Sequence, residues 1–468
     1  MRYKNESNML LPKMSALVIA VLFGGSIPAY ADEQSEQLMK QRIEQLESQV
    51  TKLQAMVEQV VEAKKGPAID GDVDEQQELG RIRLKVEALE NSRESSGFKD
   101  LKISGMIDPT YIYNRARSSG GFNFLGNFNG NTNATGNSIY TYYNSYFGQS
   151  RLQLDKEMEG GTKFKVTLVA NKSTNTGSIL QEASMSVPLN GDTNTRFIAG
   201  QFPDWSGYEY YFSDQQKLIS HNLLFDFAIP SFYTGAGVDI TRGNLEMKGM
   251  IANMNTSNRA DHNKGQVLVY RGDYTINEYS GFGFSGVEGE YAGGGDVSPS
   301  KWLDMIGVDG FYTRGAVTLN GHAMYGQWKN SAFNGGKAQW AGFSALMAYK
   351  FIPTLEGVVR LDYLQNDKNG GGTIAAGGQD GLNGFGPTAE DVAKTDPTSA
   401  TFDPNFVVTK GANRSALSLG LDYAFNPNVM FKAEFRFDHA NIPVFQYVKD
   451  GSYKDNNQMF GLSTVLNF

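Results

Sequence analysis

The stretch Met459-Phe-Gly-Leu-Ser-Thr-Val-Leu-Asn-Phe468 decides the fold class of this 468-residue chain. From Phe460 to Phe468, every second residue is an aromatic residue, a leucine or a threonine. Glycine, serine, valine and asparagine stand between them. Successive side chains of a β-strand point to opposite faces, so this period of two predicts a strand with one apolar face. The same period therefore identifies further strands elsewhere in the chain.

A period of two recurs throughout residues 99–468. Clear examples are Phe164–Leu168, Leu355–Tyr363, Leu417–Phe425 and Phe431–Asp438. In the last of these, apolar residues alternate with Lys432, Glu434, Arg436 and Asp438. Each such strand has one apolar face and one polar, charged or small face. This pattern fits a soluble β-sandwich with its core inside, and equally an outer-membrane barrel with lipid outside and water inside.

Strand and loop lengths favour the barrel. The runs are often 10 to 14 residues long, whereas strands of globular proteins centre on about 5 or 6 residues and tilted membrane strands need about 9–11. Short turns alternate with long Gly- and Asn-rich loops at 115–140, 202–234, 367–413 and 441–456. A barrel with tight turns at one end and large loops at the other has this alternation. We predict an all-β transmembrane barrel of about 16 antiparallel strands, with 14 or 18 left open.

Aromatic residues near the ends of the predicted strands support a position in a membrane. Rings with a polar tip favour the two membrane–water interfaces. We expect an aromatic girdle formed by Tyr111, Tyr113, Tyr142, Tyr143, Tyr146, Phe311, Tyr312, Trp328, Trp340, Tyr349 and Phe425. The mean hydropathy of -0.38 is then an average over a lipid-facing surface, a wet interior and polar loops.

Residues 1–98 have a different organisation. Basic residues precede the apolar run Met14–Phe23, and Ala29-Tyr-Ala31 offers the small residues that signal peptidase reads, so 1–31 is predicted to be a secretory signal peptide. A short N-terminal anchor is the alternative. Residues 32–65 are predicted to be a coiled-coil helix, because apolar residues are spaced by alternating steps of four and three. A single amphipathic helix packed on the rest of the protein stays open. Residues 66–98 form a linker and a second short helical segment.

Taken together, these features resemble a bacterial outer-membrane porin of the general-porin type with an N-terminal coiled coil. The alternation that ends at Phe468 resembles the C-terminal strand that the barrel-assembly machinery reads, which makes Phe468 a candidate assembly signal. The resemblance implies a homotrimer in the bacterial outer membrane, in contact with its lipid, with the coiled coil in the periplasm. It also implies a water-filled channel for passive diffusion of small hydrophilic solutes.

The resemblance further implies that the loop at about 202–234 folds into the barrel as a constriction. Its candidate constriction residues are Asp204, Trp205, Tyr208, Glu209 and Asp214. The predicted pore-lining residues are Arg151, Lys163, Lys165, Arg196, Arg360, Lys432, Glu434, Arg436 and Asp438. We expect the loop carboxylates to face the lumenal cations and to set up a transverse field there. The mixture of both signs on one strand argues against a strongly anion-selective channel.

Several functional classes are excluded or disfavoured. The chain has no Cys, which excludes disulfides, thiolate metal sites and cysteine nucleophiles. Its 4 His fall in separate predicted elements, so we expect no metal site, no cofactor and no enzymatic activity. A net charge of -8 disfavours nucleic-acid binding. Three alternatives remain: a structural outer-membrane anchor that tethers the envelope through the coiled coil, a sugar-selective porin, and an exported soluble β-sandwich on a helical stalk.

Overall fold

The computed structural model describes Leu84 and residues 100–125, 148–170, 180–254, 265–291, 301–375 and 380–468. The chain divides into two compact units, 1–93 and 94–468, and the second unit contains all of the strands described below. The predicted signal peptide lies outside the described residues. The predicted coiled coil at 32–65 also lies outside them. Of the predicted linker at 66–98, only Leu84 is described.

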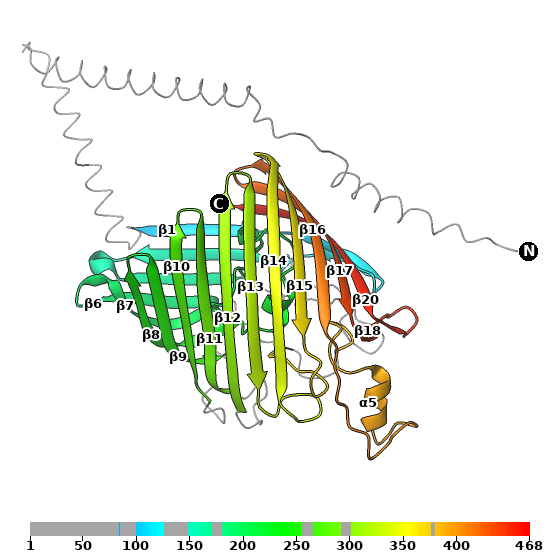
Figure 1. Cartoon of the computed structure of the whole chain (residues 1–468). Coiled ribbons are helices and arrows are strands. Elements are labelled where there is room, and N and C mark those ends of the chain that lie inside the picture. The colour runs from blue at the N-terminus through cyan, green and yellow to red at the C-terminus, as the bar shows by residue number, and fades with distance from the viewer. Residues whose placement is uncertain are drawn as a thin grey trace, which may run out of the picture. The chain divides into compact units, whose positions relative to one another are not determined.

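The second unit is a closed antiparallel barrel with 16 strand positions among the described residues (Figure 1). β20 closes it by pairing with β17 on one side and with β1 and β2 on the other. This confirms the predicted fold class and strand number. The barrel strands are β1 (Leu101–Ile107), β2 (Thr110–Asn114), β4 (Ser150–Glu157), β5 (Lys163–Val169), β6 (Leu180–Leu189), β7 (Asp192–Pro203), β8 (Phe232–Arg242), β9 (Leu245–Met254), β10 (Val267–Asn277), β11 (Ser280–Tyr291), β12 (Lys301–Arg314), β13 (Val317–Trp328), β14 (Ala338–Ile352), β15 (Leu355–Gln365), β16 (Arg414–Asn426), β17 (Val429–Ala440) and β20 (Asn456–Asn467).

The first strand position is shared by two short strands. β1 and β2 are separated by Asp108 and Pro109, and proline has no N–H to donate to a β-ladder. β1 pairs with β4, whereas β2 pairs with β3 (Ser119–Asn123), which lies within the predicted loop 115–140. The prediction of a loop over the whole of 115–140 was therefore wrong, because residues 119–123 form a strand.

Turn lengths alternate as predicted. The turns after β6, β8, β10, β12, β14 and β16 are each about two residues long in the described chain. Asn190 and Gly191 form the first of them, both with positive φ (53° and 75°), which matches the twist of a tight hairpin. The opposite end carries the longer connections. They include α5 (Ala389–Thr395), which extends beyond the barrel in Figure 1, and the small hairpin of β18 (Phe445–Gln446) and β19 (Tyr453–Lys454).

The outer face of the barrel is apolar. Leu421, Phe431 and Leu462 illustrate this on β16, β17 and β20, because their side chains are exposed while their neighbours in sequence point inward. An exposed apolar belt on a closed barrel is the surface that a bilayer covers. No helix among the described residues is long and apolar enough to cross a membrane.

The inner face is not polar throughout. On β9 to β13, lumen-facing residues such as Met250, Val269 and Leu303 are apolar and at most 1% exposed. Trp340, predicted to belong to the aromatic girdle, is 1% exposed and donates from Nε1 to the Ala228 carbonyl inside the barrel (3.2 Å). Trp328 is also buried. The girdle prediction was wrong for these two residues, because this part of the interior is a packed core and not water.

Candidate functional site: a lumenal loop and the cavity beside it

The connection between β7 and β8 folds into the barrel. It contains the short 3-10 helix η3 (Ser213–Gln215) and the short helix α4 (Leu223–Phe227). Asn222 caps α4, since its side chain accepts a hydrogen bond from the Phe225 N–H (2.8 Å). Both helical segments of this connection are therefore short. α4 lies against β14 and β15, and η3 lies against β20.

α4 fills the apolar part of the lumen. Leu223, Leu224 and Phe227 are each at most 1% exposed and belong to the same buried cluster as Met250, Val269 and Leu303. The long connection after β15 adds Phe385, whose ring meets that of Phe227 edge-on at 4.6 Å. Loop and wall thus form one hydrophobic core, which blocks this side of the barrel to water.

The polar wall of β15 to β17 binds the backbone of the lumenal loop. Lys432 donates to the Ser213 carbonyl (2.6 Å), and Arg436 donates to the His221 carbonyl (2.6 Å). Glu434 accepts from the Ile219 N–H (2.8 Å), from the Ser220 N–H (2.7 Å) and from the Ser220 hydroxyl (2.5 Å). These lumen-facing charges are at most 2% exposed. They fix the loop and do not line an open channel.

The loop carboxylates make direct ion pairs. Glu209 pairs with Arg360 (2.9 Å), and Asp214 pairs with Arg151 (2.8 Å). The sequence predicted that opposite charges would face each other across the constriction. They are instead in contact, because buried charges are strongly destabilised unless they are paired. Asp438 has the same arrangement, between Arg414 and Arg436.

Burial shifts the pKa of several ionisable side chains of the loop, and His221 and Asp204 illustrate the two directions. Burial lowers the pKa of the His221 imidazole to about 3, so the ring is neutral at pH 7, and it stacks on Phe225 at 4.2 Å. Burial raises the pKa of Asp204 to about 6, although hydrogen bonds from Tyr233 and Ser206 act in the opposite direction. The buried Asp204 carboxyl group is thus held at the start of the loop by hydrogen bonds from uncharged groups of Ser206 and Tyr233.

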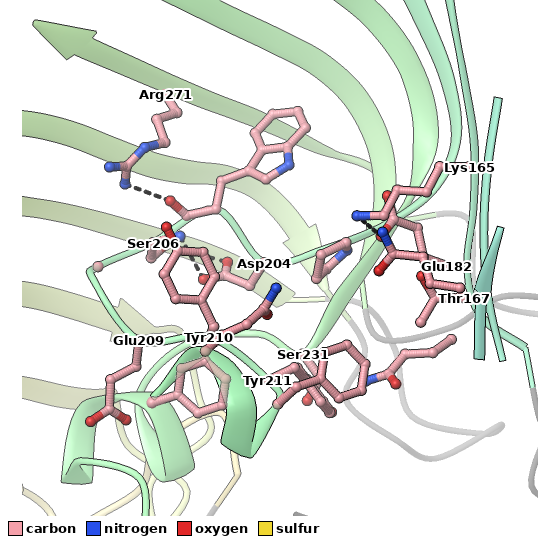
Figure 2. Close-up of a pocket in the computed structure, with 18 of the residues that line it drawn as sticks. Lys165, Thr167, Glu182, Asp204, Ser206, Glu209, Tyr210, Tyr211, Ser231 and Arg271 are labelled. Carbon is pink, nitrogen blue, oxygen red and sulfur yellow. Dashed lines mark hydrogen bonds and ion pairs between the residues drawn. The ribbon is translucent and has the colours of Figure 1, made fainter. Parts of the chain in front are cut away.

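A cavity of about 390 Å³ remains between the loop and the opposite wall. The loop contributes residues 204–207 and 209–212 together with Gln215, Phe225 and Ser231, and β4 to β6, the end of β7, β9 and β10 contribute the rest. In Figure 2, Lys165, Thr167 and Glu182 lie on one side of the cavity, and Ser206 and Glu209 on the other. Polar groups and aromatic rings thus face the same space.

Of the predicted pore-lining residues, only Lys163 and Lys165 line this cavity or a second cavity near the start of β5, and the others make contacts within the protein. Lys165 lines the first cavity and, together with Lys163, also lines the second, which has a volume of about 270 Å³. Arg196 holds the turn after β4 by donating to the Gly161 carbonyl (2.7 Å). The other predicted residues contact the loop or one another, as described above. The cavity is therefore bordered by the loop, by the β4–β6 wall and by Lys248, Arg271 and Asp273 of β9 and β10, and not by the β15–β17 wall.

The sequence correctly indicated Lys248 as a residue facing water, but it did not indicate the other polar strand residues that line the cavity: Gln153, Thr167, Gln181, Glu182, Arg271 and Asp273. Arg271 lies on β10, where it pairs with Asp273 (2.6 Å) and Asp309 (2.9 Å) and donates a hydrogen bond to the Trp205 carbonyl. The Arg271 side chain lies on the lumenal face of β10. Predicting this orientation would have required knowledge of how β10 pairs with its neighbouring strands.

Comparisons with known proteins give one family match. A family model described as "Protein of unknown function (DUF3138)" matches residues 63–273 and 274–468. No curated protein matches the sequence.

Solved structures with a similar fold are outer-membrane proteins. An anion-selective porin from Comamonas acidovorans has 8% identity and a TM-score of 0.49, covering 79% of this chain and 99% of that one. OmpT, an outer membrane protein of Vibrio cholerae folded in vitro, has 9% identity and a TM-score of 0.48, with coverage of 79% and 97%. OpdK of Pseudomonas aeruginosa with vanillate has 9% identity and a TM-score of 0.39, with coverage of 79% and 99%. The closed strand pairing of the chain itself confirms the predicted porin-like barrel.

Proposed function

The chain belongs to the family described as a protein of unknown function (DUF3138), and from its geometry we propose that it is a bacterial outer-membrane channel for passive diffusion of small hydrophilic solutes. One observation carries the proposal. A closed barrel of this strand number retains a cavity with polar lining residues between its lumenal loop and the β4–β6 wall, and a second cavity at the start of β5 that shares Lys165 with the first. A barrel of about 16 strands is too wide for side chains alone to fill. Water and solutes would follow these cavities.

The conducting path is eccentric. The loop is joined to β15 by ion pairs, to β17 by hydrogen bonds, and to a buried apolar cluster that includes β9–β14 residues. On the side of β4–β6 it is joined by the Arg151–Asp214 pair, and the cavity beside this pair is left for water. Lys165 supports a continuous route, because it lines both cavities and its side chain is 39% exposed. Passage through a narrow route of this kind favours small solutes with polar surfaces.

The proposal also includes the export, membrane location, oligomeric state and assembly that the sequence predicted. The signal peptide 1–31 directs export, and the coiled coil at 32–65 lies in the periplasm and supports a homotrimer. Phe468 is read by the barrel-assembly machinery, and outer-membrane lipid surrounds the apolar belt. The constriction is the loop at about 202–234.

Planar-bilayer recording of the purified full-length protein tests this function. We expect stepwise, ohmic currents in salt solution. A correctly assembled barrel that gives no current steps would contradict the channel and would favour the envelope tether.

A further inference from the structure

We propose that the 390 Å³ cavity is a binding subsite for an uncharged ring bearing several hydroxyl groups, that is, for a solute of the monosaccharide class. The inference rests on the proposed channel function and adds the class of solute that this channel retains. A volume of this size falls within the range of about 300–1,000 Å³ that is usual for small-molecule sites.

Tyr210 provides an exposed ring at the cavity. Its side chain is 59% exposed although the residue belongs to the loop inside the barrel. Its backbone carbonyl accepts hydrogen bonds from His221 Nε2 (3.0 Å) and from the Gln216 side-chain amide. The position of the residue is thus fixed through its backbone while the ring remains uncovered. An aromatic face left in water offers favourable contact to the apolar face of a bound ring.

Unpaired polar atoms lie on the facing wall. Thr167 is 1% exposed, and its hydroxyl oxygen has no hydrogen-bond partner within the described chain. The Gln181 side-chain carbonyl oxygen on β6 is likewise buried without a partner there. Both residues line the cavity. Buried polar groups in native proteins are nearly always hydrogen-bonded, so these two atoms call for a ligand that brings hydroxyl groups.

The charges around the cavity favour a neutral ligand. Lys165 pairs with Glu182 (2.9 Å), Arg271 pairs with Asp273 and Asp309, and Lys248 approaches Glu246 (3.7 Å). A charged solute would lose hydration without finding an unpaired counter-charge. A neutral polyhydroxylated ring would use both the aromatic face and the unpaired polar atoms.

Single-channel recording with D-glucose as the probe tests the subsite. We expect a reversible, saturable reduction of current by glucose, and half-reduction by sodium gluconate or sodium benzoate only at concentrations at least about tenfold higher. Tyr210→Ala should raise the glucose concentration for half-reduction by roughly tenfold, whereas Tyr210→Phe should retain it. Thr167→Val should raise it by roughly threefold to tenfold. Tyr423→Ala, on the lipid-facing side, is the matched control and should leave it unchanged.

The outcomes separate the two proposals. A channel that conducts salt but shows no saturable glucose effect overturns the subsite and leaves the channel function intact. A stronger effect of gluconate or benzoate, or an unchanged effect of glucose on Tyr210→Ala, also overturns it. Absence of current before any solute is added overturns the channel itself. Heat-modifiable gel mobility of each variant shows that its barrel has assembled.

Discussion

Glu434 lies on the lumenal face of β17 and accepts three hydrogen bonds from the lumenal loop, two of them from backbone N–H groups. Its side chain is buried, and Arg360 and Arg436 donate to the next carbonyls of the same loop. Backbone groups inside a barrel need such partners as strictly as those in any protein interior. Glu434 therefore helps to determine how far the loop projects into the lumen.

Replacing Glu434 with Ala should loosen the loop. The change leaves two backbone N–H groups without acceptors, at a cost of about 1–3 kcal/mol each. We expect Glu434→Ala to give a larger and noisier single-channel conductance than the wild type.

The control for this variant is Glu390→Ala on α5, which extends beyond the barrel; the Glu390 side chain is 78% exposed and pairs with Lys394. It should conduct like the wild type. Equal conductance and equal noise in Glu434→Ala and the wild type would show that the hydrogen bonds of Glu434 do not hold the loop.

At the scale of elements, the strands of the barrel differ in what they face. β16 and β17 follow the predicted alternation, with apolar residues toward lipid and charged or small residues inward. β9 to β13 carry apolar residues on both faces over part of their length, because their lumenal side chains belong to the same buried cluster as Leu223, Leu224 and Phe227 of α4. A strand that is apolar on both faces marks a region of the lumen without water.

Cysteine labelling tests this division of the lumen. The chain has no Cys, so each variant carries a single thiol. We expect a water-soluble methanethiosulfonate reagent to modify Gln153→Cys, at the cavity, at least about tenfold faster than Met305→Cys, in the packed core. Equal rates would mean that water reaches both walls.

The sequence was sufficient to predict a barrel of about 16 strands, because a period of two and alternating loop lengths are local signals, but it did not predict β3 within the loop 115–140. It also placed Glu209 and Asp214 on a loop that enters the barrel. It could not show that Arg360 and Arg436 bind this loop, since such contacts join residues more than a hundred positions apart. The break at Asp108-Pro109 could have been found, because proline interrupts a ladder.

At the scale of the whole molecule, closure depends on the last strand. Phe468 and Gly105 exchange two backbone hydrogen bonds (3.0 and 3.1 Å), and the Phe468 ring lies so close to Gly105 that a Cβ there would meet it at 2.5 Å. β20 thereby connects the end of the barrel to its beginning.

Deletion of Phe468 should reduce the amount of assembled barrel in the outer membrane, because it removes these bonds and the residue proposed as the assembly signal. Heat-modifiable gel electrophoresis of membrane fractions measures this amount. Phe425→Ala, an exposed residue at the end of β16, is the control and should assemble normally. Wild-type levels after deletion of Phe468 would contradict its role in assembly.

The reversal potential in asymmetric salt tests the eccentric channel most directly, when the wild type is compared with Lys165→Glu. Lys165 lines both cavities, so reversal of its charge should shift the channel toward cation selectivity. Lys350→Glu, on β14 across the barrel, should have a smaller effect. The predicted result is a wild-type channel with current steps, a reversal potential shifted toward cation selectivity in Lys165→Glu, and a smaller shift in Lys350→Glu. An absence of current, or an identical reversal potential for Lys165→Glu and the wild type, would contradict a conducting path beside the lumenal loop.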